Sequence, residues 1–430
     1  MKQLIKYVRI VTCDEDFTLY DGGMIAIDDG QLTYVGEQDD AYMASFGADE
    51  VIEGNDNIVM PGLVNAHTHL SMTLLRGHGS DLPLREWLED KMWPAEAKLV
   101  DRDCYIGSMI GLAEMLRSGT TAFLDMYFHM DQTAEAVKEA GLRAVLTPGV
   151  VAGNDLEDRV TGIKKLRADY QEDWCIYVWP GPHAEYTNTT ESLKRSVELA
   201  KELGCGLHIH LSETEREVEE CVARHGMSPV KYFNEIGIFD VPTVAAHCVA
   251  VDDDDIKILS EKHVNVVHNP TSNMKLASGC APVQRMLDAG INVALGTDGA
   301  ASNNNLDMLE EMHIAALIAK GFTGDPTALN ASQVIKMATI NGAKALGMED
   351  SIGSLEVGKQ ADLIMLDGHS VFSRPRGEWL NNLVYSMGRS DVVMTMIDGK
   401  ILMRDGAYTT IAINKMLEAF DQSATRLTMD

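Results

Sequence analysis

The middle of the chain, from residue 58 to residue 351, alternates short apolar runs with stretches of helical spacing, many of which end in Gly. This alternation predicts parallel strands joined by crossover helices, and eight such units fit a (β/α)₈ TIM barrel better than an open sheet. An open doubly wound sheet is the alternative, but Asn-Ala-His-Thr-His after the first strand lacks the Gly-rich turn that would cradle a nucleotide. The predicted strands span residues 58–66, 120–125, 143–151, 175–179, 206–211, 243–249, 264–267 and 291–295.

The two ends of the chain are β-rich instead. Asp-Asp-Gly at 28–30 and Asp-Gly at 398–399 each lie between apolar or alternating runs, and each predicts a hairpin. Because chain termini lie close together in many domains, we expect residues 1–57 and 352–410 to form one small sheet module rather than two domains. The expected elements are hairpins over 24–35 and 392–403, a strand over 361–366 and a C-terminal helix over 411–430.

The charge balance is strongly acidic, since 65 Asp and Glu against 36 Lys and Arg give a net charge of −29. Such a chain is repelled by nucleic acid and by anionic membranes, so neither is expected as a partner. No apolar run approaches the roughly 18 residues of a membrane span, and the N-terminal segment lacks the apolar region of a signal peptide. The seven cysteines are widely spaced without C-x-x-C, which indicates reduced thiols in the cytoplasm.

Histidines and carboxylates gather at the ends of the predicted strands, where TIM-barrel enzymes carry their chemistry. The first strand runs into His67-Thr68-His69, and because alternate strand residues point the same way, both imidazoles can reach one metal ion. On spacing alone, either His208 or His210 could be a further ligand. Imidazoles with one carboxylate favour Zn²⁺ over Fe²⁺ or Mn²⁺. The later strand ends contribute His208, His210, Glu213, His247 and Asp298.

These residues and their neighbours resemble the amidohydrolase superfamily. The matching pattern is Pro61-Gly62-Leu63-Val64 before His67-Thr68-His69, followed by His210, His247 and Asp298. Several further segments of the chain are similar to the 5'-methylthioadenosine/S-adenosylhomocysteine deaminases. The resemblance covers nearly the whole chain and implies a TIM barrel beside a small β-sandwich formed by the N- and C-terminal segments. The further segments are 92–99 around Glu96, Gly181-Pro182-His183, His210-Leu211-Ser212-Glu213, Ala245-Ala246-His247-Cys248 and residues 296–303 around Asp298.

The resemblance implies a site with one divalent metal ion. Its ligands would be His67, His69, His210 and Asp298, with His208 as a structural residue. His247 would hold and polarise the metal-bound water. Relatives with two metals use a lysine at the end of the fourth strand, where this chain has Trp-Pro-Gly-Pro-His at 179–183. We therefore expect one ion, with Zn²⁺ first and Fe²⁺ or Mn²⁺ as alternatives.

The implied reaction is hydrolytic removal of the 6-amino group of an adenosine derivative. Glu213 would protonate ring N1 and then help ammonia leave, and Asp298 would take the proton of the attacking water while remaining a ligand. With His247, these are the expected catalytic residues. Without the neighbouring His210, a carboxylate such as Glu213 at a helix start would be read as an ordinary solvated charge.

A set of substrate-binding residues is also implied by the resemblance. Glu96 would contact the ribose hydroxyls, His183 a purine ring nitrogen and Arg159 the amino-acid tail of S-adenosylhomocysteine, with Glu213 and Asp298 at the reacting ring. Read without the resemblance, Glu96 and Arg159 are surface charges of helical segments. Some relatives carry a second arginine where this chain has Pro148, which favours methylthioadenosine or adenosine as substrate.

The sequence also has features that bear on three alternative functions. His183-Ala184-Glu185 matches the H-x-E of cytidine-deaminase zinc sites, but the P-C-x-x-C that those sites need is absent. The same ligands would serve an aminohydrolase acting on guanine or an s-triazine, because the pocket selects the ring. A non-catalytic barrel scaffold is the alternative of a different class, and the complete ligand set argues against it. A small nucleoside is the expected partner, and both a monomer and a homo-oligomer stay open.

Overall fold

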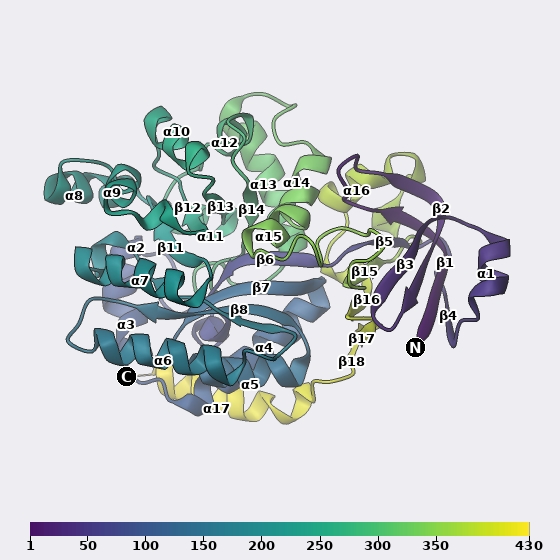
Figure 1. Ribbon diagram of the computed structural model, residues 1–430, viewed down its shortest axis with the longest axis horizontal. Coiled ribbons are helices and arrows are strands. Elements are labelled where there is room, and N and C mark those ends of the chain that lie inside the picture. The colour runs from purple at the N-terminus through teal and green to yellow at the C-terminus, as the bar shows by residue number, and fades with distance from the viewer. Residues whose placement is uncertain (430) are drawn as a thin grey trace.

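Nine strands from both ends of the chain form one mixed sheet in the computed structural model, which describes residues 1–429 (Figure 1). They are β1 (Lys2–Val11), β2 (Leu19–Asp28), β3 (Gln31–Glu37), β4 (Glu50–Glu53), β5 (Ile58–Pro61), β15 (Leu363–Leu366), β16 (Val392–Ile397), β17 (Lys400–Arg404) and β18 (Ala407–Tyr408). Strand β5 joins the two ends, because it pairs in parallel with β1 and antiparallel with β15. Both predicted hairpins are confirmed, as β2–β3 and β16–β17.

Two further sheets are parallel and come from the middle of the chain. One contains β6 (Leu63–Thr68), β7 (Thr120–Tyr127), β8 (Arg143–Val150), β9 (Ile176–Val178) and β10 (Gly181–Pro182); the other contains β11 (Leu207–Leu211), β12 (Thr243–His247), β13 (Asn265–His268) and β14 (Val293–Leu295). The two sheets meet at both edges. His210 N donates to the carbonyl of His183 beyond β10 (2.9 Å), and Asp298 N donates to the carbonyl of His67 in β6 (3.0 Å).

The first predicted strand, 58–66, is wrong as one element, because it is two strands in different sheets. After β5, Gly62 N donates to the carbonyl of Asp362 (3.0 Å), whereas Leu63 N donates to the carbonyl of Gly119 just before β7 (2.9 Å). A side chain at Gly62 would overlap Thr121. The backbone therefore passes close to Thr121 where it crosses from one sheet to the other, and this approach requires glycine. Every residue of β5 and β6 is buried, and the apolar run therefore continues across the break and hides it in the sequence.

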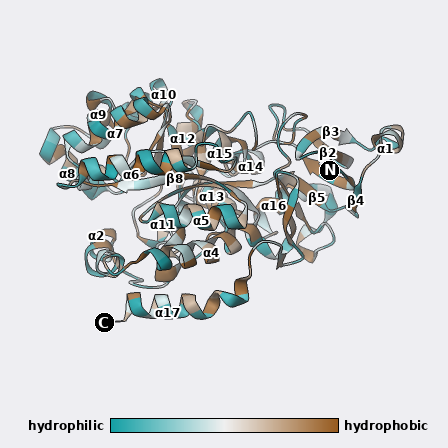
Figure 2. Cartoon of the chain, turned by 60° about the horizontal axis from the view of Figure 1, so that its bottom comes forward, coloured by the Kyte–Doolittle hydropathy of each residue, from teal (hydrophilic) through white to brown (hydrophobic). Residues whose placement is uncertain are grey.

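Helices follow the parallel strands and cover their outer faces (Figure 1). The α-helices of the described residues are α2 (Leu84–Trp87), α3 (Trp93–Glu96), α4 (Asp101–Ser118), α5 (Met130–Ala140), α6 (Leu156–Asp169), α7 (Thr190–Leu203), α8 (Glu215–His225), α9 (Pro229–Ile236), α10 (Asp253–Glu261), α11 (Pro270–Lys275), α12 (Val283–Asp288), α13 (Met308–Thr323), α14 (Ala331–Met337), α15 (Ile340–Ala345), α16 (Trp379–Tyr385), α17 (Leu417–Thr428) and α1 (Asp40–Phe46), the last of which packs on the nine-stranded sheet. Figure 2 shows hydrophilic and hydrophobic residues alternating along these helices. In α7, for example, Leu193, Val197 and Ala200 are buried on one face.

Glycines end several helices immediately before a strand, as the sequence predicts. Gly119 after α4 and Gly141 after α5 have φ of 90° and 87°. Glycine enters this left-handed region without the steric cost of a Cβ, so the helix stops and the chain turns at once into β7 or β8. Short turns of this kind bring successive parallel strands into register beside each other.

The C-terminal helix α17 packs against α4 (Figure 1). Arg426 Nη1 donates to the carbonyl of Lys98 (2.8 Å), and Arg426 also forms an ion pair with Asp103. Asp430, the last residue of the predicted helical segment, lies outside the described residues. Within residues 1–429, no helix combines the length and the apolar character that a membrane crossing requires.

The parallel strands share one apolar interior. A single cluster of buried side chains includes Val64 of β6, Val145 of β8, Val244 of β12 and Ala294 of β14, and thus unites both parallel sheets. The nine-stranded sheet has a separate cluster, formed by residues such as Ile25 and Leu363. The polar ends of the parallel strands are therefore held by a packed core below them.

A buried ion pair connects the parallel strands to the nine-stranded sheet. Arg143 at the start of β8 donates to Asp362 through Nε (2.6 Å) and Nη2 (3.1 Å), and the two side chains are 8% and 1% exposed. Removing the carboxylate of Asp362 would leave the buried guanidinium with only the more distant carboxylate of Asp398, at 3.9 Å. We therefore expect Asp362→Ala to lower the free energy of unfolding by about 3–5 kcal/mol, measured by urea unfolding.

The control for this prediction removes both charges. Arg143→Met with Asp362→Leu leaves no unpaired buried charge, so this double variant should lose much less stability than Asp362→Ala. Equal losses in the two variants would contradict the ion-pair explanation.

Candidate functional site

One cavity of about 410 Å³ lies at the carboxyl ends of the parallel strands. Tyr127 ends β7, His210 lies in β11, His247 ends β12 and Asp298 follows β14, and all four line this cavity. An apolar wall comes from α2, α3 and the π-helical segment between them. That wall contains Leu84, Trp87, Leu88 and Trp93. The cavity thus combines reactive groups from the strands with apolar surface suited to a small organic ligand.

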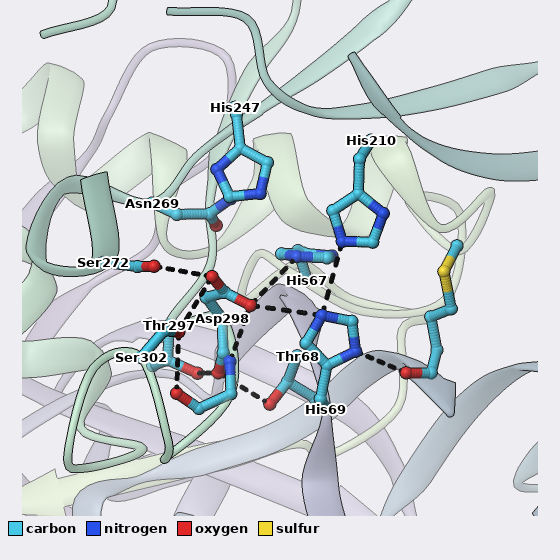
Figure 3. A network of polar contacts seen from close by, with 12 residues as sticks. His67, Thr68, His69, His210, His247, Asn269, Ser272, Thr297, Asp298 and Ser302 are labelled. Carbon is cyan, nitrogen blue, oxygen red and sulfur yellow. Dashed lines mark hydrogen bonds and ion pairs between the residues drawn. The ribbon is translucent and has the colours of Figure 1, made fainter. Parts of the chain in front are cut away.

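Three imidazoles and one carboxylate converge at the side of this cavity (Figure 3). Oδ1 of Asp298 lies 3.3 Å from Nε2 of His67 and 3.2 Å from Nε2 of His69. Nε2 of His210 lies 3.3 Å from Nε2 of His69. His247 adds a fourth imidazole, whose ring centroid is 5.4 Å from that of His67. All the residues predicted to surround the metal are therefore close together.

The donor atoms fit a bound divalent ion. Nδ1 of His67 is 2.9 Å from Nε2 of His208, Nδ1 of His210 is 2.8 Å from the carbonyl of His183, and Nδ1 of His69 contacts the carbonyl of Met126. A carbonyl partner makes Nδ1 the protonated nitrogen and leaves the Nε2 lone pair available to a cation. Nε2 of His67 is buried without a hydrogen-bond partner. Separations of 3.2–3.3 Å between donor atoms match the edges of a tetrahedron around an ion with bonds of about 2.0 Å.

Charge states in the cluster also suit metal binding. Burial lowers the pKa of His67 to about 4 and that of His210 well below its ordinary value, so both imidazoles are neutral at pH 7. Burial opposes ionisation of Asp298, but the close contacts and charges of His67 and His69 outweigh it and hold the pKa of Asp298 well below its usual range. Burial opposes the protonation of His69, but its contact with Asp298 outweighs burial and raises the pKa of His69 to about 9, so an ion that binds there displaces the proton of His69. Neutral imidazoles and an ionised carboxylate are the forms that bind a metal.

Asp298 is oriented by its neighbours (Figure 3). Ser272 Oγ (2.6 Å) and Ser302 Oγ (3.0 Å) both donate to Oδ2, and Gly299 N donates to Oδ1 (2.7 Å). Oδ1 is therefore the oxygen that faces the histidines, while the hydroxyls hold the other oxygen. These hydrogen bonds fix the orientation of the Asp298 carboxylate, so that only Oδ1 is directed at the position an ion would take.

Glu213 and His247 are neighbours in the cavity. Oε2 of Glu213 lies 3.8 Å from Nε2 of His247, and Ser278 Oγ donates to Oε1 of Glu213 (3.4 Å). Burial raises the pKa of Glu213 above its ordinary value, so this carboxyl holds a proton closer to neutral pH than a surface glutamate does. Nδ1 of His247 is 2.8 Å from Oδ1 of Asn273, which turns Nε2 toward the cavity. The cavity therefore places a proton carrier beside a fixed imidazole.

The three residues predicted only to bind substrate divide between two cavities. Glu96 and His183 line the cavity described above; burial raises the pKa of Glu96 and lowers that of His183 to about 3. Glu96 is thus not the surface charge that its helical position suggests. Arg159 instead lines a second cavity of about 410 Å³, together with Pro148. Its Nε is 2.9 Å from Oδ2 of Asp155, and its Nη1 donates to the carbonyl of Gly149 (3.2 Å).

Several supporting residues were missed by sequence reasoning. Asn273 orients His247, and Ser272 and Ser302 orient Asp298. His208, which was expected as a structural residue, orients His67. A signal for two of the missed residues exists, since Asn-Pro-Thr-Ser-Asn at 269–273 is a polar run directly after the seventh predicted strand. No functional residue had been assigned to that strand end.

Comparisons with known proteins show which family the chain resembles. A sequence model of the amidohydrolase family matches residues 58–402. A 5-methylthioadenosine/S-adenosylhomocysteine deaminase of Thermoanaerobacter pseudethanolicus is 48% identical over 432 residues and 99% of both chains. A 5'-deoxyadenosine deaminase of Methanosarcina mazei is 47% identical over 99% of this chain and 98% of its own. The crystal structure of an adenosine deaminase of Xanthomonas campestris with bound zinc has a TM-score of 0.95 at 35% identity, over 99% of this chain and 98% of that one.

Proposed function

Because this chain belongs to the amidohydrolase family, we propose that it is a metal-dependent aminohydrolase that converts an adenosine derivative and water into the inosine derivative and ammonia. The proposed substrates are 5'-methylthioadenosine, S-adenosylhomocysteine and adenosine. The observation that carries the proposal is the convergence of His67, His69, His210 and Asp298 beside Glu213 in one cavity. Two relatives of nearly half identity over the whole chain, both named as deaminases of 5'-modified adenosines, support the substrate class.

The fold proposed for this enzyme is a (β/α)₈ barrel that begins with β6 and extends to residue 351, in which β9 and β10 together form the fourth strand. Hydrogen bonds at both edges of the two parallel sheets and their shared interior support closure into one ring. Residues 1–61, which include β5, would form the small β-sandwich module together with residues 352–410, and α17 would be the C-terminal helix. The free cysteines suit the reducing cytoplasm as the compartment.

The proposed metal ligands are Nε2 of His67, His69 and His210 together with Oδ1 of Asp298, and Zn²⁺ is the ion that this donor set favours. A divalent ion bound there lowers the pKa of water from 15.7 to about 7 and so supplies hydroxide at neutral pH. His208, Ser272 and Ser302 would keep the ligands in place, because each contacts one of them on the side away from the cavity.

Proton transfers are assigned to the residues of the cavity. Glu213 would donate its proton to N1 of the purine as C6 is attacked, which is the state that its raised pKa favours. Asp298 would accept the proton of the attacking water and pass it to the amino group. Glu213, ionised after its transfer to N1, would take the proton of the C6 hydroxyl and so help the amino group leave as ammonia. Nε2 of His247 would hold the water in line with C6 and polarise it. Water adds its oxygen to C6 and the C6–N bond breaks, which balances the reaction.

Substrate recognition is assigned to residues around the same space. Glu96 would accept hydrogen bonds from the ribose hydroxyls, and His183 would contact a purine ring nitrogen, with Nδ1 held 3.0 Å from Oγ1 of Thr187. Arg159 would meet the tail of S-adenosylhomocysteine through the second cavity, which shares Tyr127, Phe128 and Gly149 with the first. Asp155 already pairs with this guanidinium, so we expect the tail to add little affinity.

A substrate panel tests the proposed function. Metal-loaded protein is incubated with adenosine, methylthioadenosine, S-adenosylhomocysteine and guanine, and ammonia release is followed. We expect kcat/KM to be highest for methylthioadenosine, because the cavity wall is apolar and the guanidinium is already paired. Faster turnover of guanine than of every adenosine derivative would contradict the substrate assignment.

A further inference from the structure

A buried carboxylate lies directly behind the loop that carries Glu213. Glu217 in α8 is 6% exposed; its Oε1 accepts a hydrogen bond from Ser212 N (2.9 Å) and its Oε2 accepts one from Glu213 N (2.8 Å). Burial of a carboxylate is costly unless hydrogen bonds compensate it, and here both oxygens bind consecutive backbone N–H groups. Glu217 does not line the cavity formed by the described residues, and the proposed chemistry gives it no direct part.

The loop held by Glu217 has an unusual backbone. Ser212 has φ of 49°, in the left-handed region that residues other than glycine adopt at an energetic cost. Its carbonyl accepts hydrogen bonds from Val249 N (3.0 Å) and Ala250 N (2.8 Å), which belong to the loop after His247. The turn between β11 and α8 is therefore held from one side by the neighbouring loop and from the other by Glu217.

The carboxyl of Glu213 itself has weak side-chain restraints. Its nearest polar partners are Ser278 Oγ at 3.4 Å and His247 Nε2 at 3.8 Å. Its direction consequently depends on the backbone of Ser212 and Glu213. Both oxygens of Glu217 accept hydrogen bonds from the N–H groups of these two residues, so Glu217 restrains this backbone directly.

We propose that Glu217 is a positioning residue that fixes Glu213 for proton transfer to the substrate, an inference that rests on the proposed deaminase function. Replacing Glu217 by Gln turns an amide NH₂ toward one of the two N–H donors and forces that donor away. A shift of about 1 Å in a reacting group can lower the rate about 100-fold. The predicted metal ligands are held by contacts that do not involve Glu217, so we expect them to keep their positions in this variant.

Glu217→Gln in the metal-loaded full-length enzyme is the first test, with methylthioadenosine as substrate. We expect kcat to fall about 10- to 100-fold while KM changes less than about threefold and metal content is unchanged. Glu219→Gln replaces an exposed carboxylate of the same helix and should leave kcat unaltered. If Glu217→Gln does not fold, Glu217→Asp, which draws the carboxylate back by one methylene, should show a loss in the same direction. Unchanged kcat in a folded variant would overturn the proposal.

A double-mutant cycle separates positioning from general support. The product 5'-methylthioinosine carries an N1–H that can donate to Glu213, so its dissociation constant, measured by calorimetry, reports on that carboxyl. Glu213→Ala should weaken binding about tenfold or more and Glu217→Gln about threefold or more, with no further loss from Glu217→Gln in the Glu213→Ala background. An equal loss in both backgrounds would refute the proposal. Failure of the proposed function would differ, because wild-type protein would then deaminate no adenosine derivative.

Discussion

Removal of the divalent ion should lower the turnover of methylthioadenosine at least about 1000-fold, since a bound metal contributes several kcal/mol to the stabilisation of the transition state. The physical reason lies in the cluster of His67, His69, His210 and Asp298. Their donor atoms converge on one point while their other atoms are held by carbonyls, an imidazole or hydroxyls. An ion held at that point would supply hydroxide at neutral pH.

The measurement uses protein treated with a strong chelator, then dialysed and assayed for ammonia release with and without added Zn²⁺, Fe²⁺ or Mn²⁺. Activity should return in proportion to bound metal, with about one ion per chain. A variant of one predicted ligand, Asp298→Asn, should show no return of activity when metal is added, because a neutral amide is a weaker ligand than a carboxylate. The matched control is Asp288→Asn, which changes an exposed aspartate at the end of α12. Full activity in metal-free protein would refute the metal-dependent mechanism.

Glu213→Gln should lower kcat about 100- to 10,000-fold, the range over which general acid–base groups contribute. Gln has nearly the same size and can still meet the ring nitrogen, but it has no proton to give at the pH of the reaction. Binding of metal should be unaffected, because Glu213 contacts Ser278 and His247 rather than the predicted ligands. The ratio of kcat values under saturating methylthioadenosine, together with metal content, tests this expectation.

Glu215→Gln is the control for Glu213→Gln. It removes an exposed carboxylate at the first turn of α8, two residues further along the chain. Its kcat should equal that of the wild type. If Glu213→Gln kept wild-type turnover with bound metal, Glu213 would be removed from the proposed mechanism and another proton donor to N1 would have to be sought.

The residues of the site were predictable where a side chain ends a strand. His67, His69, His247 and Asp298 follow apolar runs, and parallel strands deliver their carboxyl ends to one place. Spacing could not separate His208 from His210, because both are buried and face the same side of β11. The structure separates them: Nε2 of His208 approaches His67 Nδ1, whereas Nε2 of His210 approaches His69.

Supporting residues were harder to predict. Ser272, Ser302 and Glu217 carry no chemistry of their own and act by contacting another residue of the site. In the sequence, Glu217 is one of several glutamates in a helical stretch, and only its burial distinguishes it from Glu219. Burial of one helix face depends on what packs against it, which the order of residues in the helix does not specify.

By itself, the sequence determined the alternation of parallel strands and helices, the two hairpins and the kinds of ligand at the site. Hydrophobic periodicity and turn residues act over a few neighbouring positions, so they can be read locally. Only the tertiary structure decided that residues 58–66 divide between two sheets and that Glu96 and Arg159 face different cavities. The reason is that these outcomes depend on contacts between segments far apart in the chain, such as β5 with β15, and such contacts leave no local pattern.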